Sequence, residues 1–251
     1  DMDGNTTIIT KAADLAFSKG ILVVNSAGNS GSETWHYIGA PADGKNVLSI
    51  GAVDHDGSCA SFSSRGPTYD GRIKPNVTTI GKNSAIVNTD GNVVYGSGTS
   101  FSSPEMAGMA ASLWQAFPTK TNAEIKDAIE RSASQYNSPD ANLGYGIPNF
   151  RKAYWYLLGI RIDDENQNQL LNVFPQPFNT EFNLLYYSAK EQTINVRIVD
   201  VVGKIIYSYD WTLQAQRIEP LVLKGIFTSS GVYSLQLVDG EKNSSQKIIR
   251  Q

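Results

Sequence analysis

Cysteine and histidine are scarce in this 251-residue chain, which has one cysteine, Cys59, and two histidines, His36 and His55. A lone cysteine cannot form an internal disulfide, and no Cys/His cluster offers the ligand spacing of a zinc site. Positive charge is not in excess either, because the formal net charge is −3, so we expect no nucleic-acid partner. No apolar run approaches the about 20 residues that span a bilayer, so we expect no transmembrane segment.

A glycine- and serine-rich segment precedes an apolar helical pattern. Residues 96–108 have the sequence Gly-Ser-Gly-Thr-Ser-Phe-Ser-Ser-Pro-Glu-Met-Ala-Gly, and we expect a helix over residues 101–117 with Pro104 in its first turn. Ser100 would then lie at the helix N-terminus, where unpaired N–H groups and the positive dipole end favour developing negative charge. A serine hydroxyl needs a base and oxyanion donors to act as a nucleophile. Ser100 is a candidate nucleophile; the alternative is that it only caps the helix.

A second polar segment follows a buried-strand pattern. The apolar run 21–24 is typical of a strand buried in a parallel sheet, and the sequence Asn-Ser-Ala-Gly-Asn-Ser-Gly follows it at residues 25–31. Ligand sites in open α/β sheets lie at this carboxyl end of the strands. Asn29 is therefore a candidate site residue, although an asparagine in such a place can also be a simple turn residue.

Together these two segments resemble the subtilisin-like serine proteases, the subtilase family. Gly-Thr-Ser-x-x-Ser-Pro is similar to the family's nucleophile segment, and Ala-Gly-Asn is similar to the segment whose asparagine amide donates to the oxyanion. The resemblance implies that Ser100 is the nucleophile and Asn29 the oxyanion donor. The substrate-binding residues that it implies are Gly28, Gly39, Gly98 and Thr99. A glycine at position 39 would leave room for a bulky apolar substrate side chain.

Two further segments fit the same family. Residues 60–67 are similar to its Ala-Ser-Phe-Ser-Ser-x-Gly-Pro segment, to which we assign a structural role and none in catalysis. Residues 74–81 lie where the family usually has Lys-Pro-Asp-Val-x-Ala-Pro-Gly, but Asn76 replaces the acid and Ile80 the second proline. Calcium steadies many subtilases, yet no ligand cluster in this sequence justifies naming a site, and we expect no cofactor.

The aspartate and histidine of the catalytic triad have no candidates in the expected places. In this family the chain order is Asp, then His, then Ser, yet no histidine precedes Asn29. His36 and His55 both lie in predicted loops beyond it, and we do not expect either to be the general base. Residue 1 is not methionine and no signal peptide opens the chain. We therefore expect a fragment, the C-terminal half of a protease domain, that does not hydrolyse peptides by itself.

The periodicity of residues 1–160 predicts an α/β fold with a mostly parallel sheet. An apolar face containing Ile8, Ala12, Leu15 and Ala16 indicates a helix over residues 7–19, and the run 47–53 indicates a second buried strand. Further helices are expected over residues 123–133 and 149–158. This partial subtilisin-like domain would end near residue 160, and we expect residues 1–160 alone to be poorly folded.

Residues 170–251 follow a polar linker at 161–169 and predict an antiparallel β-sandwich. The expected strands cover residues 181–187, 193–199, 204–209, 216–223, 232–238 and 246–249, with hairpin turns at 201–204 and 238–241. Four motifs in order resemble the C-terminal sorting domain of type IX secretion substrates: residues 172–178, 196–204, 231–233 and 247–251. Gln176 departs from that family's Pro-Asn-Pro. The alternative is an ordinary accessory sandwich that packs on the enzyme or binds carbohydrate.

Taken together, the resemblances imply a secreted or cell-surface serine endopeptidase that is exported across the outer membrane. Its substrates would be proteins or peptides, and residues 170–251 would engage the type IX secretion machinery. Ser100 would form an acyl-enzyme, and the triad acid and base would come from outside these 251 residues. A competing hypothesis is a catalytically inactive subtilase-like surface protein that acts as a binding or scaffold module.

Overall fold

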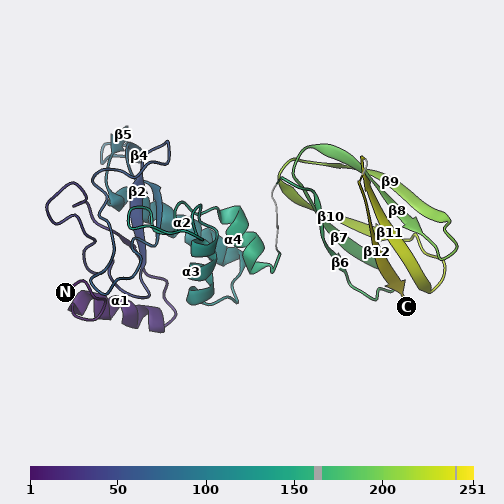
Figure 1. Ribbon diagram of the computed structural model, residues 1–251, viewed down its shortest axis with the longest axis horizontal. Coiled ribbons are helices and arrows are strands. Elements are labelled where there is room, and N and C mark those ends of the chain that lie inside the picture. Colours follow the sequence, from purple (N-terminus) through teal and green to yellow (C-terminus); the bar gives the residue numbers. More distant parts are fainter. Residues whose placement is uncertain (161–165, 241) are drawn as a thin grey trace. The chain divides into compact units, whose positions relative to one another are not determined.

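The computed structural model describes residues 1–160, 166–240 and 242–251, which form two compact units, Asp1–Gly159 and Ile160–Gln251. The first unit combines helices with a small sheet, whereas the second is built from strands (Figure 1). Residues 161–165 of the predicted linker, and Glu241 of the second predicted hairpin turn, lie outside the described residues.

A three-stranded parallel sheet lies at the centre of the first unit, in the order β1 (Val24–Ser26), β2 (Leu48–Val53), β3 (Val77–Ile80). Every residue of β2 is buried, as expected for a central parallel strand. The first strand begins at Val24 and not at residue 21, because the Ile21 N–H still donates to the Ala16 carbonyl at the end of the preceding helix. Strand β1 ends at Ser26 and leads directly into the polar segment that carries Asn29.

Helix α2 (Thr99–Ala116) packs against the three strands, and α3 (Asn122–Arg131) and α4 (Phe150–Leu157) pack on α2 and on each other, so that their apolar residues share one core with the sheet. The second helix begins two residues before the predicted start, so Pro104 is its sixth residue and not part of its first turn. Proline has no N–H to donate to the carbonyl of Ser100, the residue four positions earlier. Ser100 itself is thus a helical residue.

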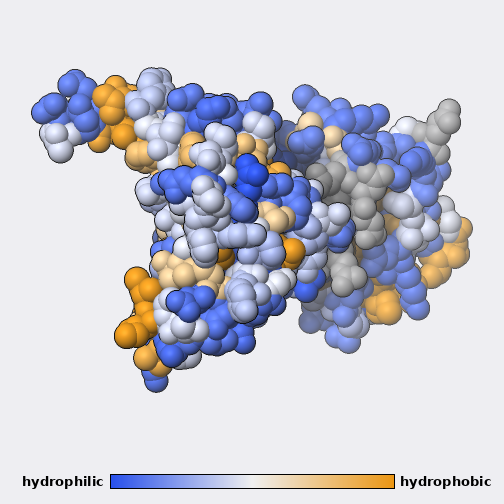
Figure 2. Space-filling view, turned by 60° about the vertical axis from the view of Figure 1, so that its left-hand side comes forward, coloured by the Kyte–Doolittle hydropathy of each residue, from blue (hydrophilic) through white to orange (hydrophobic). Residues whose placement is uncertain are grey.

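The first helix, α1 (Ile8–Ser18), is present as predicted, but its apolar face is exposed. Ile8 is 86% and Leu15 61% exposed, whereas Thr10 on the opposite side is buried. Thr10 packs inward because its hydroxyl donates to the Asp43 carboxylate at 2.6 Å. An orange apolar patch lies at the lower left of Figure 2, at the level of α1 in Figure 1.

A two-stranded antiparallel hairpin, β4 (Ser84–Val87) and β5 (Val93–Gly96), connects β3 to the start of α2. Its Val87 and Val93 pair directly across the hairpin and are both largely exposed. The last residue of β5, Gly96, lies close to the Phe101 ring of α2. The hairpin thereby leads directly into the segment that contains Ser100.

The second unit is an antiparallel β-sandwich of two sheets, in the orders β10-β7-β6 and β12-β11-β8-β9. Its strands are β6 (Gln169–Phe174), β7 (Glu181–Ser188), β8 (Gln192–Val199), β9 (Ile205–Leu213), β10 (Arg217–Lys224), β11 (Gly231–Asp239) and β12 (Lys242–Arg250). Phe182, Leu223, Ile194 and Leu235 come from both sheets and share one buried core. The predicted sandwich is therefore confirmed, with β6 as a strand that the sequence pattern did not indicate.

Candidate active site

Ser100 occupies the second position of α2, directly after two residues that are buried. Gly98 caps the helix with φ of +158°, and Thr99 is fully buried behind the serine. The Ser100 side chain itself is exposed. The N–H groups in the first turn of a helix have no partner within the helix. Ser100 therefore presents its hydroxyl to solvent beside backbone donors and the positive end of a helix dipole.

Asn29 lies next to this helix start, although 70 residues separate it from Thr99 along the chain. The Thr99 backbone N–H and hydroxyl both donate to Asn29 Oδ1, at 2.9 and 3.0 Å. Because two donors face the same atom, that atom is the oxygen of the Asn29 amide, and both of these hydrogen bonds use it as the acceptor. The Nδ2 donors are the part of the amide that remains for a ligand. The structure thus brings together the two segments that carried the sequence argument.

Glycine is required at position 28, which lies between the end of β1 and Asn29. Its φ is +113°, and an added Cβ would lie 2.8 Å from Ser64 Oγ. The Gly28 N–H also faces the Thr99 hydroxyl at 3.3 Å. Gly28, Asn29, Gly98 and Thr99 therefore lie together, directly before Ser100.

Gly39 approaches the same site from a different loop. Its N–H donates to the Ala27 carbonyl at 3.2 Å. An added Cβ at Gly39 would meet no atom within 4 Å, so open space lies in front of this backbone.

A short segment, Phe62–Arg65, connects these two loops and was not expected to matter for the site. The Gly31 N–H donates to the Phe62 carbonyl at 2.8 Å, and the Ser64 N–H donates to the Gly28 carbonyl at 2.9 Å. On the other side, the Ile38 N–H donates to the Arg65 carbonyl at 2.9 Å. We call residues 62–65 the strap; its residue types alone give no sign of these backbone bonds.

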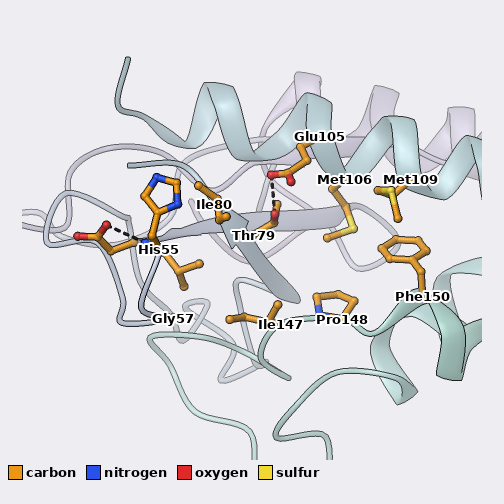
Figure 3. Close-up of a pocket in the computed structure, with 12 residues that line it drawn as sticks. His55, Gly57, Thr79, Ile80, Glu105, Met106, Met109, Ile147, Pro148 and Phe150 are labelled. Atoms are coloured by element: carbon orange, nitrogen blue, oxygen red, sulfur yellow. Dashed lines mark hydrogen bonds between the residues drawn. The ribbon is translucent and has the colours of Figure 1, made fainter. Parts of the chain in front are cut away.

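The two histidines lie in other surroundings. His36 Nδ1 is 3.3 Å from the Thr34 carbonyl, and His55 Nε2 is 3.4 Å from the Asn83 carbonyl. Within residues 1–160, 166–240 and 242–251, no histidine hydrogen-bonds to the Ser100 hydroxyl. His55 instead lines a separate hollow of about 330 Å³ with Met106, Met109 and Phe150 (Figure 3).

That hollow is mostly apolar and its lining residues do not include Ser100 or Asn29. Two carboxylates, those of Asp54 and Glu105, line it, and Glu105 points to Thr79 and accepts the threonine hydroxyl at 2.6 Å (Figure 3). Cys59 is half-buried, and burial raises the pKa of its thiol, which lowers its reactivity at neutral pH. Among the described residues, no group of three or more His, Cys, Asp or Glu side chains is placed to hold a metal ion.

Comparison with known proteins places the chain in a family. Residues 2–146 match the model of the subtilase family, so the chain belongs to that family of serine proteases. It is 38% identical over 154 residues to the thermophilic serine proteinase of Bacillus sp. (strain AK1), covering 61% of this chain and 36% of that protein. It is 34% identical over 151 residues to subtilisin E of Bacillus subtilis (strain 168), covering 59% of this chain and 37% of the relative. The chain thus spans little more than a third of the length of these relatives.

Solved structures agree with the family assignment. The self-cleaved protease domain of PatA superposes with a TM-score of 0.53 at 25% identity, covering 63% of this chain and 58% of that one. The maturation protease PagA superposes with a TM-score of 0.50 at 28% identity, covering 59% and 55%. The first unit therefore has a partial subtilisin-like fold.

Residues 172–251 match the model of a secretion-system C-terminal sorting domain. This confirms the expected type IX sorting domain and indicates export, with a secreted or cell-surface location. Among the helices of the described residues, none has the length and apolar character needed to cross a membrane.

Proposed function

We propose that the full-length protein is a secreted serine endopeptidase that cleaves proteins or peptides through an acyl-enzyme on Ser100. The observation that carries this proposal is the pair of Thr99 hydrogen bonds to Asn29 Oδ1. These bonds tie Asn29 to the residue directly before the exposed Ser100 and leave its Nδ2 donors for the oxyanion that the proposed reaction would form. Membership of the subtilase family supports the same reaction.

In the proposed reaction, Ser100 Oγ attacks the peptide carbonyl while a histidine accepts the hydroxyl proton. The carbonyl oxygen becomes an oxyanion that Asn29 Nδ2 and the Ser100 N–H hold. Collapse of this intermediate expels the amine, which takes the proton back from the histidine. Water then attacks the acyl-enzyme in the same way, releasing the acid and restoring Ser100.

The histidine and its aspartate are contributed, in this proposal, by a part of the protein outside residues 1–251. The surroundings of His36 and His55 support this, because each faces a backbone carbonyl and not the serine. Residues 1–251 by themselves would then bind the oxyanion but lack the base, and we expect them to be inactive. Gly39, with its open front, would admit a bulky apolar substrate side chain, and residues 170–251 would engage the type IX machinery.

A fluorophosphonate probe tests the reaction, because it reacts quickly only with an activated serine. We expect the full-length protein to be labelled at Ser100, with labelling lost in Ser100→Ala and absent from residues 1–251. The matched control is Ser103→Ala, which removes a neighbouring hydroxyl of the same helix and leaves labelling intact. A folded full-length protein that stays unlabelled would instead support the competing role of an inactive binding or scaffold module.

A further inference from the structure

We propose that Ser64 is a positioning residue that holds Asn29 in place for oxyanion binding. The inference rests on the proposed function and assigns a catalytic consequence to the strap, residues 62–65. Ser64 does not itself face the reacting atoms; it acts through the loop that carries Asn29.

Ser64 contacts the residues on both sides of Asn29. Its backbone N–H donates to the Gly28 carbonyl at 2.9 Å, and its hydroxyl oxygen accepts the Ser30 N–H at 3.0 Å. One residue thereby fixes the peptide before Asn29 and the peptide after it. The strap adds a third bond one residue further on, from the Gly31 N–H to the Phe62 carbonyl.

The two ends of Asn29 are therefore held by different parts of the protein. Thr99 holds the side-chain Oδ1 from the helix side, whereas Ser64 holds the backbone from the strap side. An amide that must meet an oxyanion at 2.7–3.1 Å needs both constraints. Thr99 reaches the backbone of this loop at the Gly28 N–H, at 3.3 Å, whereas the peptide after Asn29 is held through the Ser64 hydroxyl.

Packing makes the Ser64 hydroxyl hard to replace. The residue is only 1% exposed, and it fills the space next to Gly28, where an added Cβ would lie 2.8 Å from Ser64 Oγ. Removal of the hydroxyl leaves the Ser30 N–H without its acceptor and opens a gap against a close-packed loop. Glycine at position 28 gives that loop a flexible joint through which it can move.

The matching control lies in the next residue. Ser63 is also fully buried, and its hydroxyl also accepts a backbone N–H, that of Ala52 in β2, at 3.0 Å. Ser63→Ala therefore removes the same kind of hydrogen bond from the same strap. The difference is that the Ser63 hydroxyl supports the sheet, and the Ser64 hydroxyl supports the Asn29 loop.

The experiment measures peptide hydrolysis by the full-length protein in Ser64→Ala, Asn29→Ala and the double variant. We expect Ser64→Ala to lower kcat about tenfold, because a misplacement well under 1 Å already weakens an oxyanion bond, with KM changed by less than about twofold. In the Asn29→Ala background, Ser64→Ala should lower kcat by less than about twofold further, since the amide it positions is gone.

Ser63→Ala should lower the melting temperature as Ser64→Ala does but leave kcat within about twofold. The inference is wrong if Ser64→Ala leaves kcat unchanged, or lowers it by the same factor with and without Asn29. A parallel loss of kcat in Ser63→Ala would also overturn it, because the effect would then be one of general stability. A wild-type protein that neither hydrolyses peptides nor reacts at Ser100 would refute the proposed function first, and this inference with it.

Discussion

Lys74 has an ionisable side chain, yet it is almost fully buried from solvent. Its side chain is 2% exposed, and Nζ donates to the Val47 carbonyl and to Asn76 Oδ1, at 2.7 and 2.8 Å. Asn76 stands where the family usually has an acid. Its Nδ2 donates to Glu130 Oε1 at 2.7 Å. The neutral form of the Lys74 amine has two N–H donors, and the Val47 carbonyl and Asn76 Oδ1 provide two acceptors for them.

Burial, and then the nearby charge of Lys126, lower the pKa of Lys74 to about 7, against a smaller opposing effect of Glu130. Below that pH both the folded and the unfolded chain carry the proton, and the folded state bears a costly buried charge. From pH 7 to about 10 only the unfolded chain keeps the proton, so stability rises with pH. The rise amounts to as much as about 5 kcal/mol in the free energy of unfolding.

We expect the urea midpoint of the full-length protein to increase between pH 7 and pH 10, and Lys74→Met to remove most of that increase. Methionine keeps the length of the side chain without its titrating amine. Lys45→Met, a change at an exposed lysine, serves as the control and should keep the increase. Parallel curves for the wild type and Lys74→Met would show that the buried amine does not titrate in this range.

The sequence pattern singled out residues whose types suit the proposed chemistry, but not those proposed to support it through their hydrogen bonds to the backbone. Ser100 and Asn29 stood out because a serine after Gly-Thr and an asparagine after a buried strand have specific uses. Ser64 did not, because its effect depends on a hydrogen bond to Ser30, 34 positions away. Such a contact follows from the fold and from no local pattern.

At the scale of whole elements, helix starts follow the caps that the sequence supplies. Thr121 caps α3 through a capping box, in which its hydroxyl accepts the Glu124 N–H and the Glu124 carboxylate accepts the Thr121 N–H. Asn149 caps α4 through its side-chain oxygen. The start of α2 was misplaced because its cap is Gly98, which makes no side-chain hydrogen bond and so leaves no distinctive signal.

Thr121→Ala should destabilise the first unit of the full-length protein by about 1 kcal/mol, because the Glu124 N–H loses its acceptor and the Glu124 carboxylate loses the hydroxyl donor. Thr121→Ser retains the hydroxyl and should cost much less. The urea midpoint at constant slope measures both changes. Equal losses in the two variants would mean that the threonine methyl group, and not the cap, contributes the stability.

At the scale of the molecule, each unit has a core of its own. One cluster of buried apolar residues joins β2, β3 and helices α2–α4, and another joins the two sheets of the sandwich. The sandwich was predictable because period-two alternation marks strands with one buried face. The first unit was predictable only in class: the apolar face of α1 indicated burial, yet Ile8 and Leu15 are exposed.

That exposed face bears on the stability of the isolated chain. Helix α1 buries only one of its residues, Thr10. The β1 strand that follows it has three residues and, among the described residues, pairs with β2 alone. An edge strand this short and an apolar helix face in water contribute little stability. The expectation that residues 1–160 alone fold poorly therefore stands as a prediction for the first unit.

Calorimetry of residues 1–251 tests both units at once. We expect one sharp unfolding transition, which belongs to the sandwich and its continuous core. Ile194→Val removes one methylene from that core at a cost of about 1 kcal/mol, and it should lower the transition by about 4–8 °C for a domain of this size. Ile129→Val makes the same change in the core of the first unit and should leave the sharp transition where it is. Two sharp transitions, each moved by one of the variants, would show instead that residues 1–160 form a stable fold without further chain.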